Sequence, residues 1–204
     1  MAGAGPAAAV VAGRVEVVGD LAVGAAVLAA AAHREIGEKM KIRRLVRHLL
    51  TPPWRMRRVF PQHTMRAIEA AIKESEATHF GEIRFAVEAS LDPMALLQGR
   101  SARERAVEVF SQLRVWDTER NNGVLIYLLL ADRRVEIVAD RGIHRDVGLP
   151  GWEVICREME RSFRQGRFEQ GVVEGIRAVA SHLVQHYPAS GANENELPDE
   201  PAIL

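Results

Sequence analysis

The stretch that most constrains the fold is residues 123–131, which are mainly apolar and lie between polar turn residues. An apolar run of this length between turn signals favours a strand buried on both faces over a helix. The polar turn 132–134 follows, and Val135, Ile137 and Ala139 then alternate with Glu136 and Val138. This pattern predicts an antiparallel hairpin, and a sheet built around it needs helices to cover it.

Helical and strand patterns before the hairpin extend the predicted domain. Residues 61–78 have helical periodicity, and residues 82–88 alternate in the manner of a strand with one face in solvent. Ser101 and Glu104 have the spacing of a capping box, which marks the start of a helix. Because this helix would connect two strands, we expect the first two strands to be parallel.

Two more helices are predicted after the hairpin, over residues 152–163 and 168–183, with Gln165 and Gly166 between them. We therefore expect an α/β domain over residues 61–187. Its sheet should be mixed, with three to four strands and helices on both faces, and a basic helix should precede it.

The two ends of the chain have a different composition from this domain. Residues 1–39 are rich in Ala, Gly and Val, and their longest apolar run is shorter than the ~20 residues of a membrane span. We expect this segment to be either disordered or an upstream extension, with Met40 as the true start. Residues 188–204 are acidic and interrupted by proline, and we expect them to be disordered.

Residues 40–60 are strongly basic, with seven Lys or Arg and no acid. Apolar residues recur at helical spacing as far as Leu50, and Pro52 and Pro53 follow, so a basic amphipathic helix is predicted. One interpretation is attachment to an anionic membrane surface or to an acidic partner. The alternative is a helix that packs on its own domain and leaves its arginines in solvent.

The overall charge and the cysteine count exclude some classes of protein. Acidic and basic residues balance at 27 each, so no nucleic acid is expected as a partner. The single cysteine, Cys156, excludes an internal disulfide and a site with several cysteine ligands. It fits a reducing compartment, and we expect a cytoplasmic protein, peripheral to the membrane if the basic segment attaches there.

Polar residues gather where the first hairpin strand begins and where the second ends, and these ends are neighbours in an antiparallel pair. Carboxylate and amide oxygens converging from loops are what calcium and similar hard cations need. The sequence therefore predicts a weak divalent-cation site, with backbone carbonyls and Asp146 nearby, formed by Asp117, Asn121, Asn122 and Asp140.

Three alternatives remain for these residues. Asp117, Asn121 and Asn122 are also typical turn formers, and Asp140 could cap a loop through local amides. Arg120 and Arg141, together with backbone amides, could instead hold an anion such as phosphate. These arginines could also simply pair with the two aspartates.

The sequence contains no recognisable catalytic constellation. Cys156 precedes Arg157 but lacks the glycine loop and later arginine that would stabilise a thiolate and hold phosphate. His144 lies in the loop of the candidate site and is the acid or base that a phosphate-ester hydrolase would use there.

Four segments resemble the TPM domain family, which includes the thylakoid lumen 18.3 kDa protein and many bacterial proteins. They are residues 81–84 (GEIR), 118–126 (TERNNGVLI), 138–143 (VADRGI) and 163–171 (FRQGRFEQG). The resemblance covers about residues 60–187. It implies an α/β domain with a mixed sheet between helices, calcium or a similar cation in the loops at one sheet end, and phosphatase activity, which has been proposed for a plant member.

Many members of that family carry a secretion signal and a C-terminal membrane span, and this sequence is more similar to the shorter soluble branch. We therefore expect a soluble, non-catalytic binding or assembly module with a protein partner and a weak cation site. The alternative is a phosphatase-like hydrolase acting at the same end of the sheet.

Overall fold

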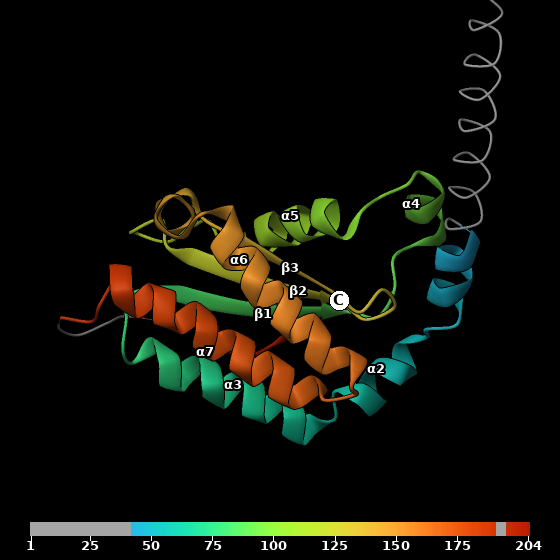
Figure 1. Cartoon of the computed structure of the whole chain (residues 1–204), viewed down its shortest axis with the longest axis horizontal. Coiled ribbons are helices and arrows are strands. Elements are labelled where there is room, and N and C mark those ends of the chain that lie inside the picture. Colours follow the sequence, from blue (N-terminus) through green and yellow to red (C-terminus); the bar gives the residue numbers. More distant parts are fainter. Residues whose placement is uncertain (1–41, 191–194) are drawn as a thin grey trace, which may run out of the picture. The chain divides into compact units, whose positions relative to one another are not determined.

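The computed structural model describes residues 42–190 and 195–204, so the predicted extension 1–39 lies outside the described residues. At the centre is a four-stranded sheet with the order β3-β2-β1-β4 (Figure 1). The strands are β1 (Glu82–Glu88), β2 (Gly123–Leu129), β3 (Arg134–Ala139) and β4 (Ala202–Ile203). β1 runs parallel to β2 and β4, and β2 and β3 form the predicted antiparallel hairpin.

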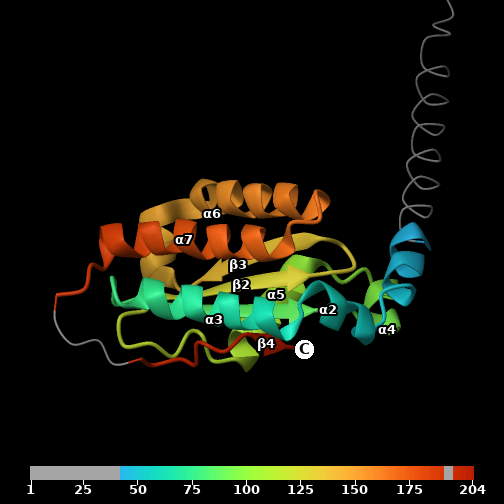
Figure 2. The ribbon, with the colours of Figure 1, turned by 90° about the horizontal axis from the view of Figure 1, so that it is seen from below.

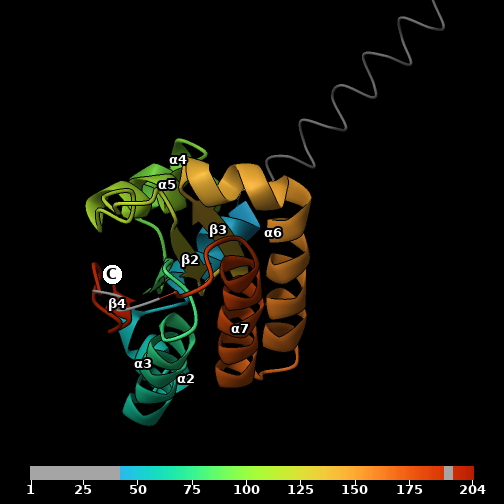
Figure 3. The same cartoon turned by 90° about the vertical axis from the view of Figure 1, so that its left-hand side faces the viewer.

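Helices cover both faces of this sheet, as predicted (Figure 3). Residues 42–49 are helical, and the helices that follow are α2 (Pro53–Val59), α3 (Gln62–Glu76), α4 (Pro93–Leu97), α5 (Ala102–Gln112), α6 (Arg141–Arg164) and α7 (Phe168–His186). One hydrophobic cluster joins α3, α6 and α7 to one face of the sheet, and a second joins α5 to the other. The α/β fold with a mixed sheet is thus confirmed.

β2 is buried on both faces along its whole length. Ile126 and Leu128 belong to the cluster with α3, α6 and α7, while Leu125 and Tyr127 belong to the cluster with α5. The capping box at the start of α5 is also confirmed, because Ser101 and Glu104 exchange both of its hydrogen bonds. These contacts fix the hairpin in the middle of the fold.

The end of the chain is ordered, so the prediction of a disordered tail is wrong for residues 195–204. β4 pairs with the free edge of β1, and Leu197 is buried against the α5 side of the sheet (Figure 2). The Nη1 group of Arg84 donates to the carbonyl oxygen of Glu200 over 3.0 Å. The tail is held by these contacts despite its acidic composition.

The predicted solvent-exposed face of β1 is wrong for the same reason. Glu82 and Arg84 are both buried, because the tail lies over them. The Glu82 carboxylate accepts hydrogen bonds from the backbone N–H groups of Glu196 and Leu197. The alternation in β1 therefore marks a polar contact with another part of the chain rather than a face in water.

Helix 42–49 packs on its domain, as the alternative interpretation expected. The side that faces the domain is not the expected one, because Arg44 and Arg47 turn towards it. Arg44 Nε lies 2.9 Å from Asp132 Oδ2, and Arg47 pairs with the same carboxylate. His48 is buried, and its Nδ1 accepts a hydrogen bond from the Leu91 N–H. The side of this helix that carries Arg44 and His48, together with Leu45, thus faces the domain. The other aliphatic residues face solvent.

α6 begins earlier than predicted, directly after β3. Asp140 is its N-cap, so the expected loop at residues 141–146 is helical. Gly148 interrupts the helix with a φ of 72°, and Pro150 lies in the turn that follows. Within the described part of the chain, no helix has both the length and the hydropathy required to cross a bilayer.

Candidate functional site

The ends of β2 and β3 meet as the sequence predicted. The N–H of Asp140 donates to the carbonyl oxygen of Gly123 over 2.8 Å, which continues the β2–β3 ladder by one pair. β1 begins at the same end of the sheet, because Glu82 is paired with Gly123. The residues before β2 and after β3 therefore form one surface.

Asn122 is fully buried at this end of the sheet. Its backbone N–H donates to Thr118 Oγ1 over 3.1 Å, and its Nδ2 donates to the carbonyl oxygen of Phe80 over 2.8 Å. The second bond fixes the orientation of the amide, since the nitrogen must point to Phe80. Its other atom, Oδ1, is buried and accepts no hydrogen bond from the described residues.

Asp140 has two different oxygens. Oδ1 accepts a hydrogen bond of 2.6 Å from the Arg141 N–H, which is the capping role considered from the sequence. Oδ2 is buried and has no hydrogen-bond donor within the described part of the protein. Capping therefore uses only half of this carboxylate.

Asn121 contributes its backbone to the same surface. It has a φ of 53°, the left-handed turn conformation that asparagine tolerates. Its carbonyl oxygen accepts a hydrogen bond from the Ile143 N–H. A β-carbon added at Gly142 would lie 2.4 Å from this oxygen and 3.3 Å from the Arg120 carbonyl oxygen, so glycine lets the two carbonyls approach α6.

Asp117 has a partner on its own turn. It is exposed, and its Oδ2 lies 3.1 Å from Arg114 Nη2. Arg120 does not pair with it; the guanidinium lies 3.7 Å from the centre of the Phe80 ring. The structure thus places the backbones of Asn121, Asn122 and Asp140 at one end of the sheet, and it holds the Asp117 carboxylate in a surface ion pair.

The charges at this site favour only weak binding of a cation. Asp140 is at the N-terminus of α6, and the partial positive charge there opposes a cation that its carboxylate attracts. The donor set combines one carboxylate with an amide oxygen and backbone carbonyls, which suits a hard cation at low affinity. In residues 42–190 and 195–204, no three His, Cys, Asp or Glu side chains are grouped to hold a metal ion.

The candidate nucleophile and the candidate acid or base are not arranged for catalysis. Cys156 is half-buried, and burial raises the pKa of its thiol to about 12, so the thiol is protonated at neutral pH. His144 lies on α6 as an exposed side chain.

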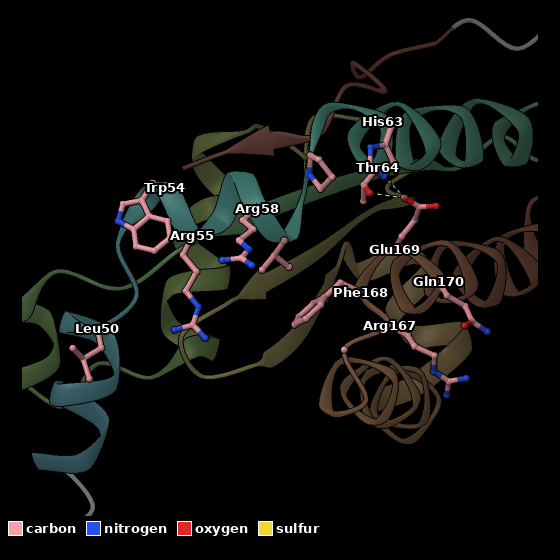
Figure 4. A pocket seen from close by; sticks show the side chains of 13 residues that line it. Leu50, Trp54, Arg55, Arg58, His63, Thr64, Arg167, Phe168, Glu169 and Gln170 are labelled. Carbon is pink, nitrogen blue, oxygen red and sulfur yellow. Dashed lines mark hydrogen bonds and ion pairs between the residues drawn. The ribbon is translucent and has the colours of Figure 1, made fainter.

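A second feature, a groove beside α2, was not predicted from the sequence (Figure 4). The groove has a volume of about 830 Å³, and its walls include Leu50, Trp54, Arg55, Arg58, Phe168 and Glu169. Glu169 is the acid in its wall, and Thr64 donates to its carboxylate, which also lies 3.9 Å from His63 Nε2. The sequence feature that could have indicated this groove is the long run without acidic residues between Glu38 and Glu69.

The arrangement defines a class, an α/β domain with a mixed sheet between helices and polar loops at one sheet end. A profile of the TPM domain family matches residues 56–182, which is more than half of the chain. The chain therefore belongs to the TPM domain family.

The chain was also compared with solved structures. The NMR structure of the BA42 protein from the psychrophilic bacterium Bizionia argentinensis is similar with a TM-score of 0.62 and 30% sequence identity, over 69% of this chain and 92% of that one. The N-terminal domain of a protein from P. gingivalis has a TM-score of 0.47 and 20% identity, over 64% and 82% of the two chains. No curated protein matches the sequence.

Proposed function

We propose that this TPM domain protein is a non-catalytic binding module that takes a divalent cation weakly at the end of the sheet. The observation that carries the proposal is the pair of buried acceptor oxygens, Asn122 Oδ1 and Asp140 Oδ2, that have no protein donor in the described residues. A buried acceptor without a donor costs free energy, and a hydrated cation supplies the missing interaction.

Calcium is the cation that the donor set suits best. Asp140 supplies the negative charge, Asn122 supplies an amide oxygen, and the carbonyls of Arg120 and Asn121 lie at the same turn. Calcium accepts such mixed oxygen ligands and completes its shell with water, whereas magnesium demands a stricter geometry. With one carboxylate in the set, the affinity belongs to the millimolar range.

The proposed partner of the module is a protein that contacts the loops at this end. Trp116 is exposed just before the turn that holds Asn121, and aromatic side chains of this kind are common anchors in protein interfaces. A bound cation would connect the turn to the Asp140 carboxylate and hold the turn in one arrangement for such a partner.

A melting experiment with calcium tests the cation site. A ligand that binds only the folded form raises the melting temperature, and a tenfold excess over the dissociation constant adds about 1.4 kcal/mol to the free energy of unfolding. We expect wild type to melt a few degrees higher in calcium chloride at ten times a millimolar dissociation constant than in potassium chloride of equal ionic strength.

Two isosteric variants locate the effect. Asp140→Asn keeps an oxygen to cap α6 but removes the charge, so it should fold normally and lose the response to calcium. Asp117→Asn is the matched control, because its carboxylate is in the ion pair with Arg114, and its response should equal that of wild type. An Asp140→Asn response equal to wild type would contradict the site. Hydrolysis of a phosphate ester that this variant abolishes would contradict the non-catalytic role.

A further inference from the structure

The outward side of residues 42–54 is unusually apolar for a surface of this protein. Five large apolar side chains are between 47% and 66% exposed: Ile42, Val46, Leu49, Leu50 and Trp54. The first four lie at positions i, i+4, i+7 and i+8, which form one stripe on a helix. An ordinary surface helix turns such a stripe to the core, and here it is turned to solvent.

Polar contacts on the opposite side hold the helix in this orientation. Asp132 receives Arg44 and Arg47, and His48 Nε2 lies 3.2 Å from its Oδ1. Burial alone would raise the pKa of Asp132, but the hydrogen bonds from His48 and Arg44 outweigh it and hold that pKa at about 2. The carboxylate is therefore charged at every physiological pH, and the stripe stays turned outward.

Unpaired arginines accompany the stripe. Arg55, Arg57 and Arg58 on α2 are exposed, and among the described residues none of them takes part in an ion pair. In Figure 4, Trp54, Arg55 and Arg58 project from α2 and all three line the groove. No acidic residue occurs between Glu38 and Glu69.

We infer that residues 42–58 form a docking face for an anionic membrane surface. The aliphatic stripe and Trp54 enter the boundary between headgroups and acyl chains, where tryptophan and amphipathic helices reside. Arg55 and Arg58 bind the phosphates of anionic lipids, since guanidinium groups pair with phosphate oxygens. This face is separate from the cation site and does not depend on it.

Charge favours a lipid surface over other occupants of this face. A second copy would bring two clusters of arginines together, and like charges across an interface oppose association. An acidic protein would satisfy the arginines, but an anionic bilayer satisfies them and also takes the aliphatic stripe into hydrocarbon.

Co-sedimentation of the full chain with vesicles tests the inference. The vesicles are phosphatidylcholine alone, or phosphatidylcholine with about one third phosphatidylglycerol. We expect wild type to pellet with the anionic vesicles at low salt and to dissociate as salt is raised. Binding to the neutral vesicles should be at least about tenfold weaker, because each arginine near an anionic surface contributes to affinity.

Two double variants and two controls assign the binding to this face. Leu49→Ser with Leu50→Ser, and Arg55→Glu with Arg58→Glu, should each weaken binding at least about tenfold and leave the melting curve intact. Val154→Ser on α6 and Arg177→Glu on α7 change exposed residues of the same types elsewhere and should bind as wild type does.

Tryptophan fluorescence gives a second readout. Trp54 and Trp116 are both exposed, but only Trp54 lies in the docking face. Lipids brominated in their acyl chains should therefore quench the fluorescence of Trp54 alone. The quenching should persist in Trp116→Phe and disappear in Trp54→Phe.

Several results would overturn the inference. One is that wild type does not pellet with the anionic vesicles. Another is that both double variants pellet as wild type does, which would place the contact outside this face. A dimer in light scattering that Leu49→Ser with Leu50→Ser dissolves would identify a second copy as the occupant. Binding to polyglutamate without binding to vesicles would identify an acidic polypeptide.

Discussion

The carboxylate of Glu82 accepts a hydrogen bond from the backbone N–H of Leu197, 115 residues further along the chain. This contact, at 3.3 Å, joins the start of β1 to the tail that ends in β4. Burial raises the pKa of Glu82 to about 7 and the pKa of the neighbouring Glu76 to about 9. The attachment of the tail is therefore sensitive to pH.

The free energy of unfolding should fall as the pH rises from about 4.5 through about 9. The folded-state pKa values of Glu76 and Glu82 lie above 4.5, so the folded protein holds more protons than the unfolded chain above that pH. Their contribution is complete below about 4.5 and is lost through about 7 and 9. Urea unfolding at pH 5, 7 and 9 measures it, and Glu82→Gln should flatten the dependence between pH 5 and 7.

The acidic side of the same profile should be governed by a different group. Burial lowers the pKa of His79 to about 4, so its contribution is present above 6.5 and is lost as the pH falls towards 4. Between about pH 4.5 and 6.5 the two glutamates together outweigh this single histidine, so stability should be greatest near pH 4.5. An equal change in stability between pH 5 and 7 in wild type and Glu82→Gln would show that the carboxylate does not hold the tail.

Leu197 should be the main apolar anchor of the tail. It is 8% exposed, and Leu197→Ala should lower the free energy of unfolding by about 2 kcal/mol, as expected for a buried leucine with some freedom to repack. Ile203→Ala is the control, because Ile203 is 57% exposed and should change stability by less than about 0.5 kcal/mol. Equal effects in the urea midpoint would contradict a docked tail.

Asp132 should hold helix 42–49 on the domain. In Asp132→Asn the guanidinium groups of Arg44 and Arg47 lose their charged partner, which should cost about 1 to 2 kcal/mol. Limited proteolysis with trypsin should then cut this helix faster than in wild type. Glu153→Gln removes an exposed pair with Arg157 and should leave both the stability and the cleavage rate unchanged.

The parts of the fold that follow from local patterns were predictable. β2 is almost entirely apolar in sequence, and a continuous apolar run of this length is typical of a strand buried on both faces. The Ser101 capping box depends on residues three apart, so it can be recognised without knowledge of the rest of the fold. Parallel pairing of β1 and β2 then followed from the handedness of crossovers.

The parts that depend on distant partners were not predictable. A helical pattern defines two sides of residues 42–49, but the side that faces the domain is decided by Asp132, 88 residues from Arg44. Composition suggested that the tail is disordered. It does not reveal that the side chains of Glu82 and Arg84 form hydrogen bonds with the tail backbone.

The candidate site was predicted in part. The hairpin predicts that the start of β2 and the end of β3 are neighbours, and the pairing of β2 with β3 confirms this, while a cation site of Asn122 and Asp140 stays a prediction. The surface pairing of Asp117 with Arg114 depends on the turn after α5, where Arg114 has a φ of 54°. The start of α6 at Arg141 was missed because Gly142 and Gly148 obscured the helical pattern.

The central claim is that Asn122 and Asp140 form one cation site, and paramagnetic NMR tests it most directly. Manganese(II) prefers the same oxygen ligands as calcium and broadens amide signals near its binding site. The account predicts that small additions of manganese broaden the amides of residues 121–123 and 140–143 first, that calcium reverses this, and that Asp140→Asn abolishes it. Broadening that begins elsewhere on the domain, or that Asp140→Asn leaves unchanged, would contradict it.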